Sequence, residues 1–540
     1  MKEPKHANLT IILALILIAG TFLFYASWIR DWLSAAPQAV SGKERGLQAG
    51  ADLTAARKAF REKLLEPSAH MRLAEALYNA GRPIDSFYVL FAARSFFGEA
   101  AFERAHALTV LYRGEHFLGP EEFDPSPANE ARLKARLSQE PGHAATTDYL
   151  AHIASARRDP KEALRLVEAG LAAHPSDPGL LSYRVELAWA AGDAAAAVAY
   201  DGKLAAENPR SFQGRKALEE LGRLASRKET GEGGETSRLA RETLQALAGR
   251  SLDEPSYFST LAMAVWGRGD VDGVRAMVME LRSKRARHGG ADAVEGALAL
   301  FDRQPEKAIS LFTAAWEANP DDLYSASKLA QLYYKQRADR EGALPYYLAL
   351  YRQNPRYDDG APAEKRIRET LDSRRETLLR YAGIDNLGRF LTAEDASLRA
   401  EACARAAQAK DARWVDTLAD LLDDDADIVR RNADYALYQI AKQAPDAIAV
   451  RREEWLSSEK PLVRARALNL FADIEPAETF PFVVKALRDP HPAVRFLAKV
   501  MVLDHYYKDD PKAAKARADY LASEKDPLVL AHYARLGAPR

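Results

Sequence analysis

The longest uncharged stretch of the chain lies near its amino terminus. Residues 9–29, LTIILALILIAGTFLFYASWI, carry no charged side chain. As a helix rising about 1.5 Å per residue they would span roughly 30 Å, the thickness of the hydrocarbon core of a bilayer. Tyr25, Trp28 and Trp32 lie at the end of this stretch, and such rings favour the headgroup layer. The pattern predicts a membrane-spanning helix over residues 8–29, after a short tail of residues 1–7.

A cleaved signal peptide is the alternative for this segment, because Lys2 and Lys5 make its start positively charged. Its apolar region would be longer than the usual ~7 to 15 residues, and the best small-residue cleavage site, 34–36, is followed by proline. We therefore expect a retained single-pass anchor, with the body of the protein on the periplasmic or extracytoplasmic side. The small and polar residues that follow are expected to form a flexible linker over 30–52.

Beyond the linker, apolar and alanine positions recur in units that close with a proline. Pro175 and Pro209 are 34 residues apart, and Pro320 and Pro355 are 35 apart. Proline lacks an N–H group and clashes with the preceding turn, so it ends a helix. A period of this size predicts a row of helix pairs. Alanines that would let the two helices of a pair approach closely stand twelve residues before each proline, at Ala163, Ala197, Ala308 and Ala343.

These units resemble the tetratricopeptide repeat (TPR) family. The family's repeat carries a leucine, a small residue, aromatic residues, alanines and a closing proline, and the best unit here supplies them at Leu329, Ala330, Tyr333, Ala343, Tyr347 and Pro355. Partial units begin at Leu73, Leu150 and Leu261, and another one closes at Pro320.

The resemblance implies a TPR-like array over residues 53–360. Residues 100–140 and the glycine-rich stretch 228–237 depart from the pattern.

After residue 360 the recurring pattern becomes a Val-Arg pair, preceded in the better units by an aspartate. Asp424 precedes Arg430 by six residues, and Asp489 precedes Arg495 by six. The five anchors are 31, 34, 31 and 35 residues apart, at Leu398-Arg399, Val429-Arg430, Val463-Arg464, Val494-Arg495 and Val529-Leu530.

These units resemble HEAT repeats of the kind grouped with phycobilisome-lyase-like proteins. The resemblance predicts connecting helices over 361–395 and a HEAT-repeat array over 396–540. The Asp-Arg pairs are expected to bridge neighbouring repeats, adding under about 1 kcal/mol each if exposed.

Each repeat unit buries its apolar face only against its neighbours. We therefore expect an all-α protein in which the TPR helix pairs and the HEAT repeats form one long curved α-solenoid, a superhelix. The rich content of alanine and leucine and the scarcity of strand patterns agree with this fold class.

Composition excludes several function classes. A net charge of −1, from 76 basic and 77 acidic residues, creates no global field for nucleic acid. Cys403 is the single cysteine, so an internal disulfide or a cysteine zinc site is excluded. The histidines form no ligand pair, and the acidic run 420–427 lacks the glycine and distal glutamate of an EF-hand. We expect no cofactor, no metal site and no catalytic site.

The family resemblance also implies where partners bind. In TPR proteins the first helix of each pair lines the inner surface, and the position that faces inward holds Tyr78, Ser155, Trp189, Trp266, Leu300 and Tyr334 here. Aromatic rings supply apolar contact area with little loss of entropy, so a groove of this kind fits an extended peptide or a polysaccharide. The alternative is that the rings pack as core. The candidate partner-binding residues are Tyr78, His152, Trp189, Trp266, Gln331, Tyr334 and Lys335.

Two hypotheses for function follow. The first is a non-catalytic membrane-anchored scaffold that binds partner proteins in a bacterial envelope assembly or an export complex. The second is a lyase-like HEAT-repeat enzyme or a chromophore- or sugar-binding protein. A visible absorption band of the purified chain with a bilin would favour the second hypothesis.

Overall fold

The computed structural model describes most of the chain. The described residues are 43–98, 102, 106, 127–209, 211–227, 234–251, 254–320, 322–381, 387–526, 529–530 and 533. The expected anchor at 8–29 lies outside them. Within these ranges, no helix combines the length and the hydropathy needed to cross a bilayer.

The described helices fall into three groups, which we name here. The N-terminal helices are α2 (Lys43–Glu62), α3 (Pro67–Asn79) and α4 (Pro83–Phe97). The first part of the middle array comprises α6 (Pro127–Gln139), α7 (Ala144–Ala156), α8 (Pro160–Ala173), α9 (Pro178–Ala190), α10 (Ala194–Glu207), α11 (Phe212–Ala225) and α12 (Gly234–Arg250). Its second part comprises α13 (Pro255–Gly267), α14 (Val271–Lys284), α15 (Gly289–Phe301), α16 (Pro305–Ala318), α17 (Leu323–Gln331), the π-helix η2 (Leu332–Gln336) and α18 (Arg340–Gln353).

A long helix, α19 (Ala363–Tyr381), leads from the middle array to the C-terminal array. The C-terminal array begins with α20 (Leu387–Leu391), α21 (Ala396–Ala409), α22 (Val415–Asp420), α23 (Asp427–Gln443), α24 (Pro445–Ala449) and α25 (Arg452–Leu456). It continues with α26 (Pro461–Ile474), α27 (Pro476–Ala486), α28 (Pro492–Leu497), the π-helix η6 (Ala498–Leu503), α29 (Asp504–Tyr506) and α30 (Pro511–Ser523). The described residues contain no β-strand, so the all-α prediction is confirmed there.

The helix pairs of the middle array end where the sequence predicts, and capping side chains mark where their second helices begin. Aspartate side chains cap the second helices α8, α10, α14 and α18 by accepting a backbone N–H three residues ahead, which satisfies an otherwise unpaired donor. Helices α8, α10, α16 and α18 each end two residues before their proline. The predicted close approaches also occur, because no surface of Ala163, Ala197, Ala308 or Ala343 is exposed.

The last helix pair of the middle array is one residue longer than the regular unit and contains a π-helix. Eight residues separate Ala151 from the capping Asp159, and eight separate Ala262 from Asp270. The equivalent residues in the last pair, Ala330 and Asp339, are nine apart. A π-turn absorbs one inserted residue inside a helix, and η2 lies in this interval. The 35-residue spacing between Pro320 and Pro355 therefore has a local structural cause.

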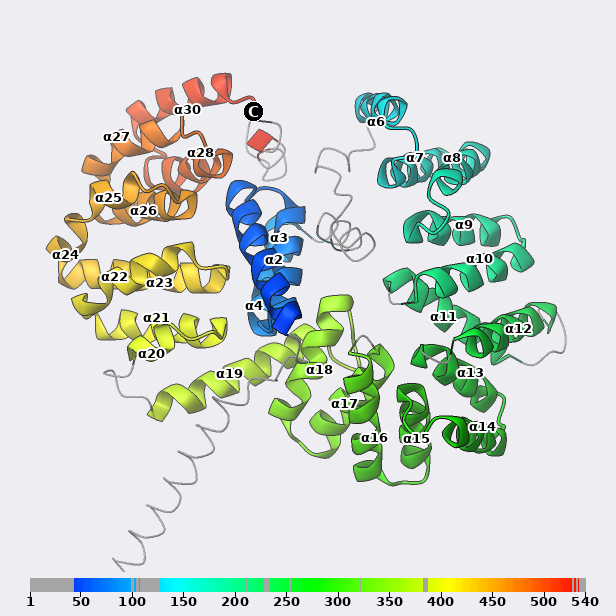
Figure 1. Cartoon of the computed structure of the whole chain (residues 1–540). Coiled ribbons are helices and arrows are strands. Elements are labelled where there is room, and N and C mark those ends of the chain that lie inside the picture. Colours follow the sequence, from blue (N-terminus) through cyan, green and yellow to red (C-terminus); the bar gives the residue numbers. More distant parts are fainter. Residues whose placement is uncertain are drawn as a thin grey trace, which may run out of the picture.

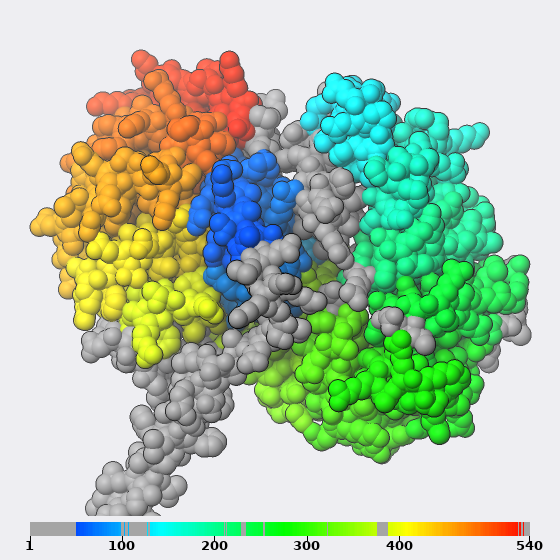
Figure 2. Space-filling model, viewed as in Figure 1, coloured from blue at the N-terminus to red at the C-terminus, as the bar shows by residue number. Residues whose placement is uncertain are grey.

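The two arrays curve as separate arms, and the N-terminal helices lie between them (Figure 1). The space-filling view shows the N-terminal helices in the gap, next to the first repeats of the C-terminal array (Figure 2). The middle array bends strongly enough that Arg215, at the start of α11, donates to the side chain of Gln353, at the end of α18.

This placement of the N-terminal helices differs from the single ribbon that we expected. The unit formed by α3 and α4 packs on α18, α21 and α23 instead of leading the row of TPR-like pairs. Its Phe87 lies 5.1 Å from the ring of Tyr351, and both side chains are buried. Residues 43–52, which we expected in the linker, lie in α2, which begins at Lys43.

A buried carboxylate in α10 makes the stability of the middle array pH-dependent. Asp201 is 3% exposed, its Oδ2 has no hydrogen-bond partner among the described residues, and burial raises its pKa to about 7. A raised folded-state pKa contributes stability at low pH that is lost as the pH rises towards that pKa.

We expect Asp201→Asn to stabilise the protein by about 1–3 kcal/mol at pH 8. The advantage should grow from about pH 4 to pH 7 and stay constant above, because Asn carries no charge to desolvate. Urea unfolding at pH 5 and pH 8 measures this difference. An equal effect at both pH values would show that the charge of Asp201 is not the cause.

Candidate functional site

The C-terminal array is organised by one repeated hydrogen-bond pattern. The arginine of each Val-Arg or Leu-Arg anchor donates its Nη1 to the backbone carbonyl groups six and five residues before it, with N···O distances of 2.5–3.2 Å. The bonded carbonyls belong to the turn just before the helix that carries the arginine. Each guanidinium group therefore holds that turn against the start of its own helix. The arginines are Arg399, Arg430, Arg464 and Arg495.

The same guanidinium groups also link neighbouring repeats. Arg399 binds Asp424 through Nε at 2.8 Å and Nη2 at 2.9 Å, and Arg464 binds Asp489 at 2.8 Å through the same two atoms. Arg495 pairs with Glu524 in the same way at 2.8 and 3.0 Å. We call these three pairs the ladder.

The predicted bridging between repeats therefore occurs, but with different partners. The carboxylate of Asp424 accepts a hydrogen bond from Arg399 of the preceding repeat. The backbone carbonyl of Asp424 accepts one from Arg430. The six-residue spacing reflects the closed turn, and the bridging pairs are 25 or 29 residues apart.

Arg430 has no carboxylate partner in the following repeat of the kind that forms the ladder, and the N-terminal helices dock beside Arg430. The position that holds Asp424 and Asp489 in other repeats holds Ser458 in the repeat after Arg430. Arg430 instead binds Asp427 at 3.2 Å and lies 5.7 Å from the centre of the ring of Phe60 in α2. A guanidinium over an aromatic face is a favourable contact.

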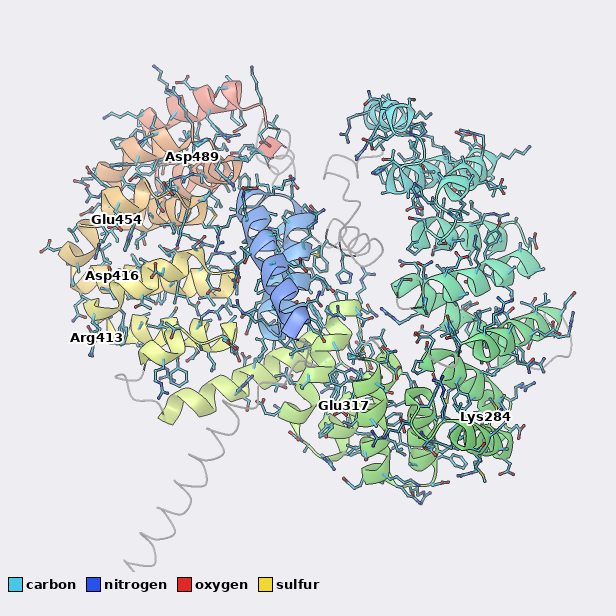
Figure 3. The ribbon with its side chains drawn as sticks, viewed as in Figure 1. Lys284, Glu317, Arg413, Asp416, Glu454 and Asp489 are labelled. Atoms are coloured by element: carbon cyan, nitrogen blue, oxygen red, sulfur yellow. The ribbon has the colours of Figure 1, made fainter. Side chains whose placement is uncertain are left out.

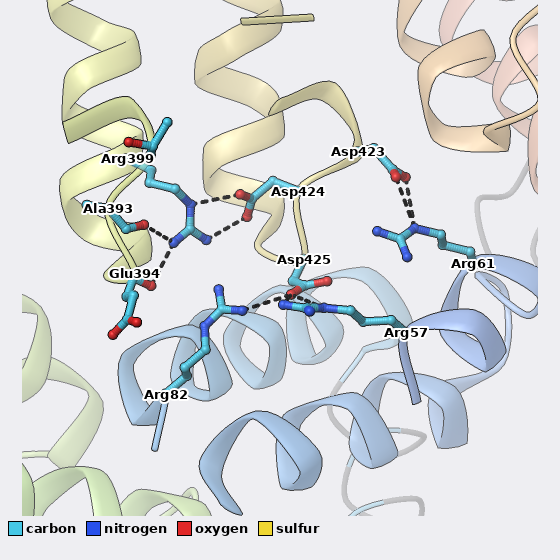
Figure 4. Close-up of a pocket in the computed structure, with 10 residues that line it drawn as sticks. Arg57, Arg61, Arg82, Ala393, Glu394, Arg399, Asp423, Asp424 and Asp425 are labelled. Carbon is cyan, nitrogen blue, oxygen red and sulfur yellow. Dashed lines mark hydrogen bonds and ion pairs between the residues drawn. The ribbon is translucent and has the colours of Figure 1, made fainter. Parts of the chain in front are cut away.

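The aspartates on either side of Asp424 hold the N-terminal helices. Arg57 of α2 binds Asp425 through Nη2 at 2.6 Å, Arg61 binds Asp423 at 3.0 Å, and Arg82, just before α4, lies 3.5 Å from Asp425. We call this set of pairs the seam. Figure 4 shows the three arginines pointing from the N-terminal helices to the 423–425 turn. The acidic run thus has a divided role: the middle aspartate joins the ladder, and the outer two join the seam.

The seam borders an open cleft of about 500 Å³. The cleft is lined by equal numbers of basic and acidic side chains, together with Thr392 and Ala393. The lining residues include no histidine, cysteine or lysine, and the basic side chains attract the acidic ones across the cleft. Among the described residues, no three His, Cys, Asp or Glu side chains gather to hold a metal ion.

A buried carboxylate joins α4 to the C-terminal array next to this cleft. Asp85 is 1% exposed, and its Oδ1 accepts the backbone N–H of Ala396 at 2.8 Å, in the first turn of α21. Burial raises the pKa of Asp85 to about 6, although Arg399 and Arg82 oppose the shift. A carboxylate at a helix N-terminus is favoured by the helix dipole, so Asp85 caps a helix that lies 311 residues away in sequence.

The C-terminal array carries a further set of ion pairs on its outer side. Asp416 and Glu454 are labelled there in Figure 3 and pair with Arg451 at 2.7 and 3.1 Å. Their carboxylate side chains are 76% and 65% exposed. Such exposed pairs add little stability.

Three of the predicted partner-binding residues lie together but are bonded within the chain. Tyr334 donates its hydroxyl to Glu369 at 3.1 Å and lies under the guanidinium of Arg366 at 4.2 Å. Lys335 donates to the backbone carbonyl of Asp359 at 2.8 Å, and Gln331 is half-buried. The contacts of Tyr334 and Lys335 hold the loop after α18 and the start of α19 against η2.

Tyr78 is also used internally. Its ring lies 4.2 Å from the guanidinium of Arg352 in α18, and that arginine binds Glu75 of α3 at 2.9 Å. Tyr78 and Tyr334 are half-buried, and each ring contacts an arginine of a neighbouring helix.

The other three candidates lie on first helices of the middle array and retain accessible surface. His152 is exposed and contacts Tyr183, with ring centres 3.9 Å apart and ring planes tilted by 34°. Trp189 is 36% exposed. Trp266 is half-buried and meets the ring of Phe301 edge-on at 5.6 Å.

The sequence reasoning missed Phe301 and the seam arginines. Phe301 is 61% exposed and follows directly after Leu300, which the sequence resemblance predicts to face inward. The signal for Phe301 was the unusual pairing of two large apolar residues at the end of a first helix. Repeat periodicity gave no signal for Arg57, Arg61 and Arg82, because their partners are more than 340 residues away.

Comparisons with known proteins identify helical-repeat structures. The chain resembles Naa15/Naa10 bound to HypK-THB, with 16% identity and a TM-score of 0.27, over 81% of this chain and 66% of that one, just under two thirds of its length. It resembles the TPR domain of P58(IPK), with 14% identity and a TM-score of 0.18, over 73% and 97% of the two chains. It also resembles a human IFIT1 dimer with m7Gppp-AAAA, with 10% identity and a TM-score of 0.23, over 92% and 100%.

Neither a protein-family model nor a curated protein sequence matches the chain. All three TM-scores lie below 0.5, and none of these likenesses assigns a role to a residue. By its own geometry, the described part of the chain is an all-α helical-repeat protein with two arrays joined by its N-terminal helices.

Proposed function

We propose that the protein is a non-catalytic scaffold that residues 8–29 anchor in a membrane and that binds partner proteins along its middle array. The observation that carries this proposal is a set of accessible rings at the ends of three first helices of the middle array, α9, α13 and α15. Trp189 belongs to α9, and Trp266 and Phe301 form a contact pair between α13 and α15. Aromatic side chains with accessible faces are enriched where proteins bind each other.

The architecture supports the same proposal. The middle array carries the TPR-like pattern of caps, alanines and closing prolines, and the C-terminal array carries the HEAT-like Val-Arg anchors. Solenoids of this kind present extended surfaces to partners. An uncharged run of bilayer length at the start of the chain supports a tether, which places the body on the extracytoplasmic side in this proposal. A bacterial envelope assembly or an export complex is the setting that fits a tethered scaffold.

Site-specific photo-crosslinking in native membranes tests this proposal. A photoreactive phenylalanine analogue is placed at Trp189, at Phe301 and, as the control, at Met279 of the second helix α14, which is 73% exposed. We expect the same partner protein to be captured from the first two positions and not from the control. Removing residues 1–33 should move the chain to the soluble fraction and reduce capture.

Other outcomes would contradict the proposal. Equal capture from Met279 would show unspecific contact. Capture of nucleic acid or polysaccharide would show that the partner is not a protein. A truncated chain that stays in the membrane fraction would rule out residues 8–29 as the anchor. A bilin absorption band of the full chain would favour the enzyme or chromophore hypothesis.

A further inference from the structure

The accessible ring pair of the middle array lies beside two arginines. Trp266 and Phe301, at the ends of the first helices α13 and α15, have ring centres 5.6 Å apart, and Phe301 is 61% exposed. Arg268 and Arg303 follow these rings by two residues each, in the turns that lead into α14 and α16. Because the ring contact brings the two helix ends together, both turns border the same apolar surface.

Most carboxylates around these turns are already engaged within the chain. One caps the start of α14, and two form ion pairs with neighbouring arginines: Asp270 accepts the N–H of Gly273 at 2.8 Å, Asp302 binds Arg275 at 2.8 Å, and Glu306 binds Arg337.

The remaining charges leave this surface with an excess of positive charge. Asp272 and Lys307, in the first turns of α14 and α16, are opposite in sign. Arg303 is exposed and Arg268 is half-buried. Among the residues that the structure describes, neither guanidinium group has an ion-pair or hydrogen-bond partner, and Nε of Arg268 is unpaired although it is buried. Two cations beside an exposed ring are therefore unused by the fold.

The backbone at Arg303 adds a second observation. Its φ of 59° lies in the left-handed region, at the position directly before the N-cap of α16. The equivalent positions before α10 and α14 hold Gly192 and Gly269, with φ of 75° and 91°, and glycine adopts this conformation without steric cost. A cation at the end of α15 offsets part of the cost through the helix dipole. Strained positions of this kind concentrate at binding sites.

We propose that the ends of α13 and α15 bind an extended segment of the partner protein in which a large apolar side chain stands next to an aspartate or a glutamate. The apolar side chain packs on Phe301 and Trp266, and Arg303, with Arg268 beside it, binds the carboxylate. Hydrogen bonds from a guanidinium group to a carboxylate are stronger than those between neutral groups. This inference rests on the scaffold function proposed above and names the chemistry of the partner at that surface.

Selection from a phage library of random dodecapeptides tests this chemistry. The full chain, purified in detergent, is the bait, and a parallel selection on Phe301→Ala identifies the peptides that bind elsewhere. We expect the peptides that depend on Phe301 to be enriched in Asp or Glu next to Trp, Phe, Leu or Ile.

The affinity of the most enriched peptide, measured by fluorescence anisotropy, then separates the two contacts. Arg303→Gly is the informative variant, because glycine fits the left-handed turn and only the guanidinium side chain is lost. We expect it to weaken binding of the acidic peptide about fivefold. A version of the peptide with Asn and Gln in place of Asp and Glu should bind Arg303→Gly and the wild-type chain equally.

Two further variants complete the comparison. Phe301→Ala should weaken binding of both peptides at least about tenfold, because both use the ring. Lys284→Gln removes an exposed cation of α14 that is labelled in Figure 3, and it should change neither affinity. Circular dichroism of each variant verifies that helix content is retained.

Several results would overturn the inference. If the enriched peptides lacked acidic residues, or if an acidic peptide bound Arg303→Gly as tightly as the wild-type chain, Arg303 would not contact the partner, while the scaffold function would stand. A lower free energy of unfolding of Arg303→Gly with unchanged peptide affinity would show a purely structural role.

Two other results would reach further. If no enriched peptide depended on Phe301, the surface would not bind protein segments, and the scaffold function at these helix ends would fail together with the inference. Tighter binding of a fluorescent oligothymidine than of the peptide would assign the two arginines to phosphate groups and the surface to nucleic acid.

Discussion

Replacing Arg399 by methionine is expected to lower the free energy of unfolding by about 3–5 kcal/mol. The guanidinium binds Asp424 through two nitrogens at 2.8 and 2.9 Å and the carbonyl groups of Ala393 and Glu394 at 2.8 and 2.7 Å. Methionine keeps the length of the side chain but leaves two buried carboxylates, Asp85 and Asp424, without this cation. Uncompensated buried charge is the main cost.

Urea unfolding followed by circular dichroism measures the effect of Arg399→Met. Arg451→Met is the matched control, because Arg451 also binds two carboxylates, but at the exposed outer side of the array. We expect the control to change the unfolding free energy by less than about 1 kcal/mol. Similar losses for both variants would show that burial of the ladder is not the source of its stability.

The second large effect is expected at Phe312 in the core of the middle array. Phe312 has no exposed surface, and its ring packs on Gly296 so closely that a Cβ there would lie 2.9 Å from ring atoms. Phe312→Ala removes this packing between α15 and α16 and leaves a cavity, so we expect a loss of about 3–5 kcal/mol.

Phe301→Ala is the matched control for Phe312→Ala. Phe301 belongs to the same helix pair but is 61% exposed, and we expect its loss to cost no more than about 0.5 kcal/mol. Thermal or urea unfolding compares the two variants under the same conditions. If Phe301→Ala were as damaging as Phe312→Ala, Phe301 would be part of the core and no longer a candidate contact for partners.

The candidate site was only partly predictable from the sequence. The Val-Arg anchors and the Asp424 and Asp489 positions were found by their spacing, and the structure shows that they link repeats. The pairing of Asp424 with Arg399 was missed, because the spacing of six residues suggested Arg430 as the partner of Asp424. The split of the acidic run between the ladder and the seam depends on Arg57 and Arg61, which lie more than 360 residues away.

Of the seven predicted partner-binding residues, the structure brings Gln331, Tyr334 and Lys335 together, but at an internal junction. The position of a residue in a repeat pattern predicts the face of the helix on which it lies. It does not predict which other residues pack on that face. Arg366 and Asp359 cover it here. The crosslinking experiment tests at Trp189 the prediction that it binds a partner, and for His152 and Trp266 this stays a prediction.

The amino-acid sequence by itself determined the helix pairs of the middle array, their capping aspartates, their close approach at alanines and their ends before prolines. It determined the Val-Arg anchors as well. All of these depend on contacts within one repeat or between neighbours, and such contacts leave a period in the sequence. Only the tertiary structure decided where the N-terminal helices dock, because Asp85, Arg57 and Phe60 meet partners that no repeat spacing links to them. Docking is selected by complementary charge and shape between distant surfaces, and this information is not periodic along the chain.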